Sequence, residues 1–92
     1  MKNRKNILLY TTGGCHLCEQ ASELFSHKKV KAIMVTFGLE VKPTEISLDE
    51  ALVERFGLSI PVLQFEGSRS ELCWPFGEDQ LISFIQSSCQ RA

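Results

Sequence analysis

The spacing of apolar residues changes along the chain, and each spacing predicts a type of element. Residues 7–11 form a short apolar run that two glycines stop, which is typical of a strand buried on both faces. Beyond the glycines, apolar residues recur at helical intervals and predict a helix that begins at or just after Cys15. The apolar positions of this helix are Leu17, Ala21, Leu24 and Phe25.

The length of this helix depends on a polar stretch that contains three lysines. Apolar residues resume the helical spacing after the lysines, so we expect one helix that runs on to Phe37, with Gly38 as its C-terminal cap. A break near Ser26 or His27 is the alternative. In both cases the lysines are expected to lie on a solvated helix face.

The middle of the chain predicts a strand and a short helix. Residues 40–47 form the strand, and Pro43 places it at a sheet edge because proline cannot donate a hydrogen bond to the sheet. Ser47 or Asp49 can cap the helix that follows, and Gly57 ends it. The apolar stripe of this helix comprises Leu48, Leu52 and Phe56.

The last third of the chain predicts two strands and a final helix. These elements are residues 62–65, 71–73 and 78–90. The complete order is β-α-β-α-β-β-α. The first two strands need a crossover and should be parallel, whereas the last two share a tight turn and should be antiparallel. The expected fold is therefore an α/β fold with a four-stranded mixed sheet covered by helices.

Length and charge limit the possible functions. A chain of 92 residues predicts one domain over residues 1–92, of which residues 1–6 are expected to be flexible. A net charge of -1 gives no general attraction to nucleic acid or to an anionic membrane. No apolar run has the length of a membrane span or of a signal peptide, so we expect a cytoplasmic protein that does not bind membranes.

The candidate chemistry lies in a Cys-x-x-Cys motif between the first strand and the first helix. Cys15 falls at the expected helix start, where free backbone N–H groups and the helix dipole favour thiolate over thiol. Cys18, one turn further on, could then resolve a mixed disulfide that Cys15 has formed. His16 would stabilise the thiolate if it were protonated, or it is simply an exposed residue between the two cysteines.

A metal site is the main alternative for the cysteine pair. Structural zinc usually takes four ligands from two such pairs. Cys73 and Cys89 are not spaced as a second pair, and we expect them to be small apolar core residues. No metal site is therefore predicted. A metal-delivery module that uses Cys15 and Cys18 stays open as an alternative function, as does a non-catalytic interaction domain.

Two segments resemble parts of glutaredoxins, which belong to the thioredoxin superfamily. Residues 9–18 resemble the opening of a glutaredoxin, and Ser59-Ile60-Pro61-Val62 is similar to the Thr-Val-Pro segment of the superfamily. The resemblance implies the thioredoxin fold, a cis peptide bond before Pro61 opposite the active disulfide, and a substrate strand that pairs with the Ile60 backbone. Residues 71–76 resemble a small bacterial subgroup of glutaredoxin-like proteins.

Departures from the glutaredoxin pattern bear on glutathione. Glutaredoxins usually carry a lysine that holds a glutathione carboxylate, and Thr12 stands in the matching position. They also carry a glycine pair against which glutathione docks, where this chain has the bulky Trp74. These departures argue against glutathione dependence, so no cofactor is expected and glutathione is at most a co-substrate. Trp74 and Phe76 are expected to pack on the last helix, with an apolar substrate rim as the alternative.

The sequence thus predicts a monomeric thiol–disulfide oxidoreductase of the glutaredoxin-like type. Its expected partners are a disulfide-containing protein or a low-molecular-weight disulfide, together with a reductase or thiol donor. Cys15 is the predicted nucleophile, Cys18 the resolving thiol and His16 a tuning residue. The predicted substrate-binding residues are Thr12, Ile60, Pro61 and Trp74.

Overall fold

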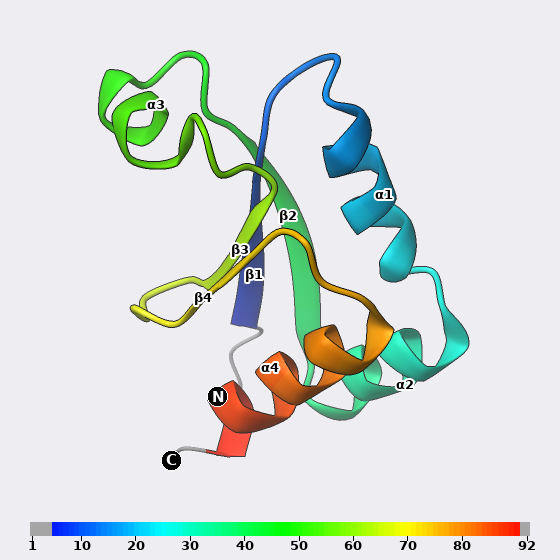
Figure 1. Ribbon diagram of the computed structural model, residues 1–92. Helices are drawn as coiled ribbons and strands as arrows, with labels where there is room; N and C mark the ends of the chain where they lie inside the picture. Colours follow the sequence, from blue (N-terminus) through cyan, green and yellow to red (C-terminus); the bar gives the residue numbers. More distant parts are fainter. Residues whose placement is uncertain (1–4, 91–92) are drawn as a thin grey trace.

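The computed structural model describes residues 5–90, which form a four-stranded mixed sheet with helices on both faces (Figure 1). The strands are β1 (Lys5–Thr11), β2 (Leu39–Glu45), β3 (Val62–Phe65) and β4 (Glu71–Cys73). The helices are α1 (His16–Leu24), α2 (Lys28–Thr36), α3 (Glu50–Phe56) and α4 (Glu78–Gln90). The predicted α/β fold is confirmed, although the chain has one helix more than expected.

The sheet has the strand order β2-β1-β3-β4. β1 pairs in parallel with β2 and antiparallel with β3, and β3 pairs antiparallel with β4, as predicted. β2 lies at an edge of the sheet, as Pro43 predicted, and β1 is its one neighbouring strand. Proline has no N–H to donate, and an edge strand has no second neighbouring strand that would need this hydrogen bond. The parallel pairing brings the carboxyl ends of β1 and β2 to the same end of the molecule, where the loop toward α1 begins.

The N-terminal segment is more ordered than expected where it is described. Lys5 and Asn6 already belong to β1 and pair with Leu39 and Glu40 of β2. The prediction of flexibility is therefore wrong for these two residues, because pairing with β2 satisfies their backbone groups. The remainder of the segment, residues 1–4, lies outside the described residues.

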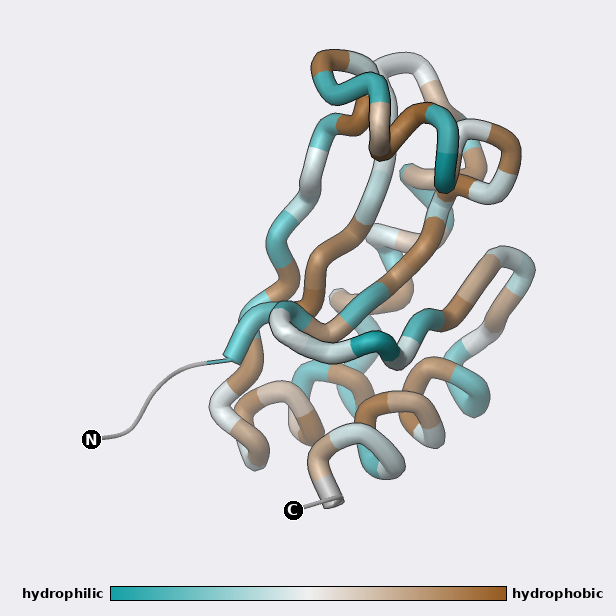
Figure 2. Tube along the Cα trace, turned by 90° about the vertical axis from the view of Figure 1, so that its left-hand side faces the viewer, coloured by the Kyte–Doolittle hydropathy of each residue, from teal (hydrophilic) through white to brown (hydrophobic). Residues whose placement is uncertain are grey.

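Two apolar cores hold the layers together, one on each face of the sheet. α1, α2 and α4 cover one face, where Ile7 and Leu9 of β1 are buried, and α3 covers the other face, where Tyr10 is buried (Figure 1). The prediction that β1 is buried on both faces is therefore confirmed. Figure 2 shows apolar segments along the central strands and alternating apolar and polar segments along the helices beneath them. Within residues 5–90, no helix combines the length and apolarity needed to cross a membrane.

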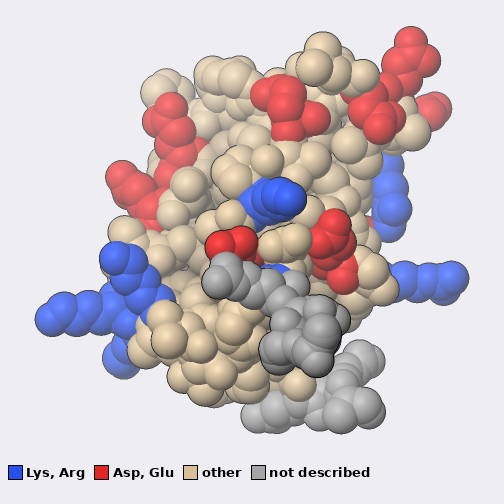
Figure 3. Space-filling model, turned by 180° about the vertical axis from the view of Figure 1, so that it is seen from behind, with Lys and Arg blue, Asp and Glu red and all other residues tan. Residues whose placement is uncertain are grey.

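The first helical region is divided into α1 and α2, so the expectation of one helix to Phe37 is wrong and the alternative break is confirmed. The Ser26 hydroxyl donates to the Glu23 carbonyl at 2.7 Å, and the His27 backbone N–H donates to the Leu24 carbonyl at 3.1 Å. Such local bonds compete with the regular helical pattern. His27 is extended, with a ψ of 142°, and α2 begins after it. The lysines of α2 are exposed as predicted, and basic side chains gather on this side of the molecule in Figure 3.

Two leucines that the spacing assigned to apolar faces are exposed. Leu17 is 44% exposed, and the buried positions of the first turns of α1 are Cys18 and Ala21 instead. Leu48 is 91% exposed because Asp49, rather than Ser47, caps α3. The Asp49 carboxylate accepts hydrogen bonds from the first N–H groups of α3, at 3.0 and 3.3 Å, so Leu48 precedes the helix and cannot join its apolar stripe.

Candidate functional site

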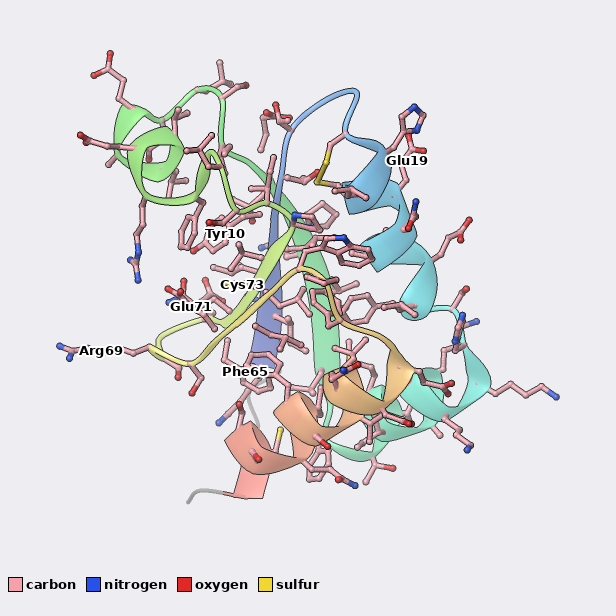
Figure 4. All side chains as sticks on the ribbon, viewed as in Figure 1. Tyr10, Glu19, Phe65, Arg69, Glu71 and Cys73 are labelled. Carbon is pink, nitrogen blue, oxygen red and sulfur yellow. A yellow bond between two sulfur atoms is a disulfide. The ribbon has the colours of Figure 1, made fainter. Side chains whose placement is uncertain are left out.

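Cys15 and Cys18 form a disulfide at the start of α1, with their Cα atoms 5.2 Å apart (Figure 4). Cys15 is the N-cap residue, and its Sγ accepts a hydrogen bond from the Cys18 backbone N–H at 3.1 Å. This sulfur thus occupies the place where a helix stabilises negative charge. Cys15 is half-buried and Cys18 is 4% exposed, so the disulfide is approached from the Cys15 side.

A glycine turn brings the chain from β1 to the cysteines. Gly14 has a φ of +79°, in the left-handed region that side chains with a Cβ disfavour. Gly13 has no positive φ, and a Cβ at either glycine would meet no atom within 4 Å. The turn therefore requires glycine at position 14 for its backbone conformation and not for space.

We expect Gly14→Ala to destabilise the protein by about 1–2 kcal/mol, because alanine pays a steric cost in the left-handed conformation. Gly13→Ala is the matched control and should leave stability nearly unchanged. Urea unfolding of both variants measures the difference. Equal losses of unfolding free energy in the two variants would contradict this account of the turn.

A cavity of about 310 Å³ lies beside the disulfide, between α1 and the carboxyl ends of β1 and β2. It brings Thr12 together with both cysteines, as expected if these residues share a substrate site. It also includes two carboxylates, Glu19 and Glu45, which the sequence analysis missed. The full lining comprises Leu9, Thr11, Thr12, Gly13, Gly14, Cys15, Cys18, Glu19, Ser22, Pro43 and Glu45.

Glu45 is held at the end of β2 by hydrogen bonds. Its Oε2 accepts from the Ser47 backbone N–H at 3.2 Å. Hydrogen bonds from the Ser47 side chain, from the Thr12 side chain and from the backbones of Ser47 and Gly13 lower the pKa of the Glu45 carboxyl below its usual value. The Ile46 backbone N–H also donates to the Thr11 carbonyl at 3.0 Å, which joins the β2 end to the loop before the cysteines.

The position of Glu45 carried a signal in the sequence. It lies near the end of the strand predicted over residues 40–47, which was expected to be parallel to the first strand, and the carboxyl ends of parallel strands meet at one edge of a sheet. An acidic residue at the end of the second strand could therefore have been placed near the motif at the end of the first.

His16 lies on the solvent side of the motif. Its side chain is 89% exposed, and its Nδ1 lies 3.8 Å from Oε1 of Glu19, a pair that is ionic only when the histidine is protonated. Exposed pairs of this kind contribute little to stability. His16 is thus an exposed residue between the two cysteines, and its effect on the Cys15 thiolate stays a prediction.

A second group of predicted site residues lies just before β3 and just after β4. The Ile60–Pro61 peptide bond is cis, which confirms what the resemblance implied. The Trp74 backbone N–H donates to the Pro61 carbonyl at 3.2 Å and so joins the two segments. This bond brings Pro61 and Trp74 side by side, and neither these two residues nor Ile60 is among those that line the cavity shared by Thr12 and the cysteines.

The aromatic residues after β4 pack as predicted. Phe76 is buried, and Trp74 packs partly buried against the same core with its ring edge-to-face on Phe76, at a centroid distance of 5.1 Å. A second cis peptide bond precedes Pro75, which the sequence analysis did not predict.

The other two cysteines are free thiols. Cys73 is exposed, so its prediction as a core residue is wrong; it lies on β4, an edge strand, opposite Val62 of β3, and belongs to neither core. Cys89 is partly buried against the core, and burial raises the pKa of its thiol. Among the described residues, no three His, Cys, Asp or Glu side chains are grouped closely enough to hold a metal ion.

Comparison with known proteins identifies solved structures with a similar fold. Protein XcR50 from X. campestris has 31% sequence identity and a TM-score of 0.71 over 88% of this chain and 96% of its own. Ne2328 from Nitrosomonas europaea has 23% identity and a TM-score of 0.63, over 90% and 92% of the two chains. A thioredoxin from Thermus thermophilus has 14% identity and a TM-score of 0.64, over 96% of this chain and 75% of its own, which shows the shared fold.

The same comparison finds no match among proteins with curated descriptions. The sequence model of one family, the glutaredoxin-like domain (DUF836), matches residues 6–86, which include the cysteine motif, the cis-proline segment and most of α4. A match of this extent over a thioredoxin-like fold shows the family, and the chain belongs to the glutaredoxin-like domain family.

Proposed function

We propose that the protein is a thiol–disulfide oxidoreductase whose reduced Cys15–Cys18 pair reduces disulfides. The observation that carries the proposal is the position of the Cys15 Sγ at the N-terminus of α1, where it accepts the Cys18 N–H at 3.1 Å. This arrangement favours a thiolate on the more accessible of the two cysteines. The disulfide geometry of the pair and the glutaredoxin-like family support the same function.

The reaction transfers two electrons from the dithiol to the substrate. The Cys15 thiolate attacks one sulfur of a substrate disulfide, which forms a mixed disulfide and releases the first substrate thiolate. The Cys18 thiolate then attacks the Cys15 sulfur, which forms the Cys15–Cys18 disulfide and releases the second substrate thiolate. Both released thiolates take up a proton. A thiol donor or a reductase restores the dithiol for the next turnover.

The residues around the site support a donor other than glutathione. Thr12 offers a hydroxyl where glutaredoxins have a lysine for a glutathione carboxylate, and the cavity beside the cysteines contains Glu19 and Glu45 instead of a cation. Trp74 fills the position of a glycine that allows close approach of glutathione to the backbone. In the proposed function, Ile60 and Pro61 border the groove that receives the substrate, and the protein acts as a monomer in the cytoplasm.

The proposal is tested by steady-state reduction of bis(2-hydroxyethyl) disulfide and of a disulfide-containing protein. We expect catalysis with a dithiol donor such as dithiothreitol, and a slower reaction with glutathione at an equal concentration of thiol groups. A rate no higher than the uncatalysed rate with every donor would contradict the proposal. If the purified protein also retained one equivalent of copper or zinc, the metal-delivery alternative would replace it.

A further inference from the structure

The cavity beside the disulfide has a negative lining. Glu19 of α1 and Glu45 at the end of β2 both contribute to it, together with the two cysteines. Among its lining residues, all of which belong to the described part of the chain, there is no lysine, arginine or histidine. The two glutamates are therefore the charged residues of the lining, and the only basic group near them that the ion pairs of the described residues show is the exposed His16, whose Nδ1 lies 3.8 Å from Oε1 of Glu19.

Glu45 is fixed in place and charged. The Ser47 backbone N–H donates to its Oε2 at 3.2 Å, which restrains this exposed side chain beside the cavity. The same set of hydrogen bonds lowers the pKa of Glu45, so it is ionised at neutral pH. A carboxylate held in this way is a better determinant of specificity than a flexible surface glutamate, because little side-chain entropy is lost when a cation approaches.

The charge of the surrounding surface has the same sign. Seen from behind, acidic side chains dominate the upper end of the molecule, where α3 and the start of α1 lie, and basic side chains lie mostly below (Figure 3). Asp49, Glu50 and Glu54 are exposed at this end. Arg55, the basic residue of α3, is paired with Glu71. The long-range field thus adds to that of the cavity carboxylates.

We propose that Glu45 and Glu19 make this site selective for disulfides that carry cationic groups close to the S–S bond, and that anionic disulfides are disfavoured. The inference rests on the proposed disulfide-reducing function and names its substrate class. Exposed charge pairs change a binding or rate constant by about two- to fivefold each. Two carboxylates that attract a cation and repel an anion should therefore separate the two substrates by at least about tenfold.

Three small disulfides of different charge test the inference at constant pH. They are cystamine, with two ammonium groups, bis(2-hydroxyethyl) disulfide, which is neutral, and 3,3′-dithiodipropionate, with two carboxylates. The rate at which each disulfide oxidises the pre-reduced protein is divided by the rate at which the same disulfide oxidises dithiothreitol. This division corrects for the intrinsic reactivity of the disulfide. We expect a cystamine-to-dithiodipropionate ratio of about ten or more at low ionic strength, and a fall toward one in 0.5 M salt.

Glutamine variants assign the effect to the two carboxylates. Glu45→Gln and Glu19→Gln should each lower the ratio about fourfold or more, because each removes an attraction for the cation and a repulsion of the anion. Glu66→Gln is the matched control, because Glu66 lies at the opposite end of β1, where it is bonded to Asn6, and it should keep the wild-type ratio. Glu45→Gln could also disturb the Thr12–Gly13 turn. Such a disturbance would change the rate with the neutral disulfide, which is insensitive to the lost charge.

The outcomes separate this inference from the function on which it rests. Equal normalised rates for the three disulfides, or a ratio that neither glutamine variant lowers, would overturn the charge selectivity and leave the disulfide-reducing function intact. Failure of all three disulfides to oxidise the Cys15–Cys18 pair would overturn both.

Discussion

Cys15→Ser is expected to lower disulfide reduction to the uncatalysed rate, a loss of about 10³-fold or more. Serine keeps the size of the side chain, and its hydroxyl can still accept the Cys18 N–H as an N-cap. What it lacks is an ionised nucleophile, because an alcohol does not form an anion under conditions in which a thiol at a helix N-terminus does. Initial rates with bis(2-hydroxyethyl) disulfide and dithiothreitol measure the loss.

A second cysteine variant controls for the removal of a thiol. Cys73→Ser removes the exposed free thiol of β4 and should keep the wild-type rate. Unfolding of Cys15→Ser by urea, compared with that of the reduced wild-type protein, shows whether the fold is intact. Substantial activity in a folded Cys15→Ser variant would show that another group is the nucleophile.

Cys18→Ser is expected to stop the reaction halfway. Cys15 can still attack a substrate disulfide, but no second thiolate is available within the protein to release the mixed disulfide. Cys18 is 4% exposed and one turn from Cys15, so in the wild-type protein it can reach the Cys15 sulfur although it is shielded from substrate. One equivalent of a mixed disulfide should therefore accumulate.

Mass spectrometry after mixing with substrate, without added donor, measures this intermediate. The Cys18→Ser protein should gain the mass of half the substrate disulfide less one hydrogen atom, whereas the wild-type protein should lose two hydrogen atoms and retain no substrate. Cys15→Ser is the control and should form little adduct. If Cys18→Ser releases both substrate thiols as fast as the wild-type protein does, Cys18 is not the resolving thiol.

Much of the fold followed from local patterns. The apolar run of β1 predicted a strand buried on both faces, and the proline of β2 predicted that this strand lies at an edge of the sheet. The tight turn before β4 predicted that β3 and β4 are antiparallel. The break between α1 and α2 was harder to predict, because helical spacing continues on both sides of it. The bonds of Ser26 and His27 to the preceding turn decide it, and they depend on side-chain geometry that periodicity does not contain.

The two exposed leucines show that apolar spacing alone does not say which residues at the start of a predicted helix are buried. Leu17 and Leu48 have the right intervals for apolar faces, but they lie at or before the first residues of α1 and α3. The caps Cys15 and Asp49 determine those starts. Cys73 is exposed for a different reason, because a three-residue edge strand leaves a side chain without a covering layer.

The site could be predicted only in part. The cysteine pair and the cis bond before Pro61 followed from a local motif and a family resemblance. Glu19 and Glu45 reach the same cavity from a helix and from an edge strand, and their approach is a property of the tertiary structure. Every dithiol site has two cysteines, whereas Glu19 and Glu45 are additional to them. We therefore expect these two carboxylates to determine the substrate preference.

The most direct measurement is the reaction of the fully reduced wild-type protein with one equivalent of bis(2-hydroxyethyl) disulfide, followed by alkylation and peptide mapping. The account predicts that two equivalents of mercaptoethanol are released, that the peptide with Cys15 and Cys18 loses two hydrogen atoms, and that Cys73 and Cys89 are recovered as free thiols. Recovery of Cys15 and Cys18 in the reduced form, with no reaction or with reaction at the other two cysteines, would contradict the proposal that this pair is the redox centre.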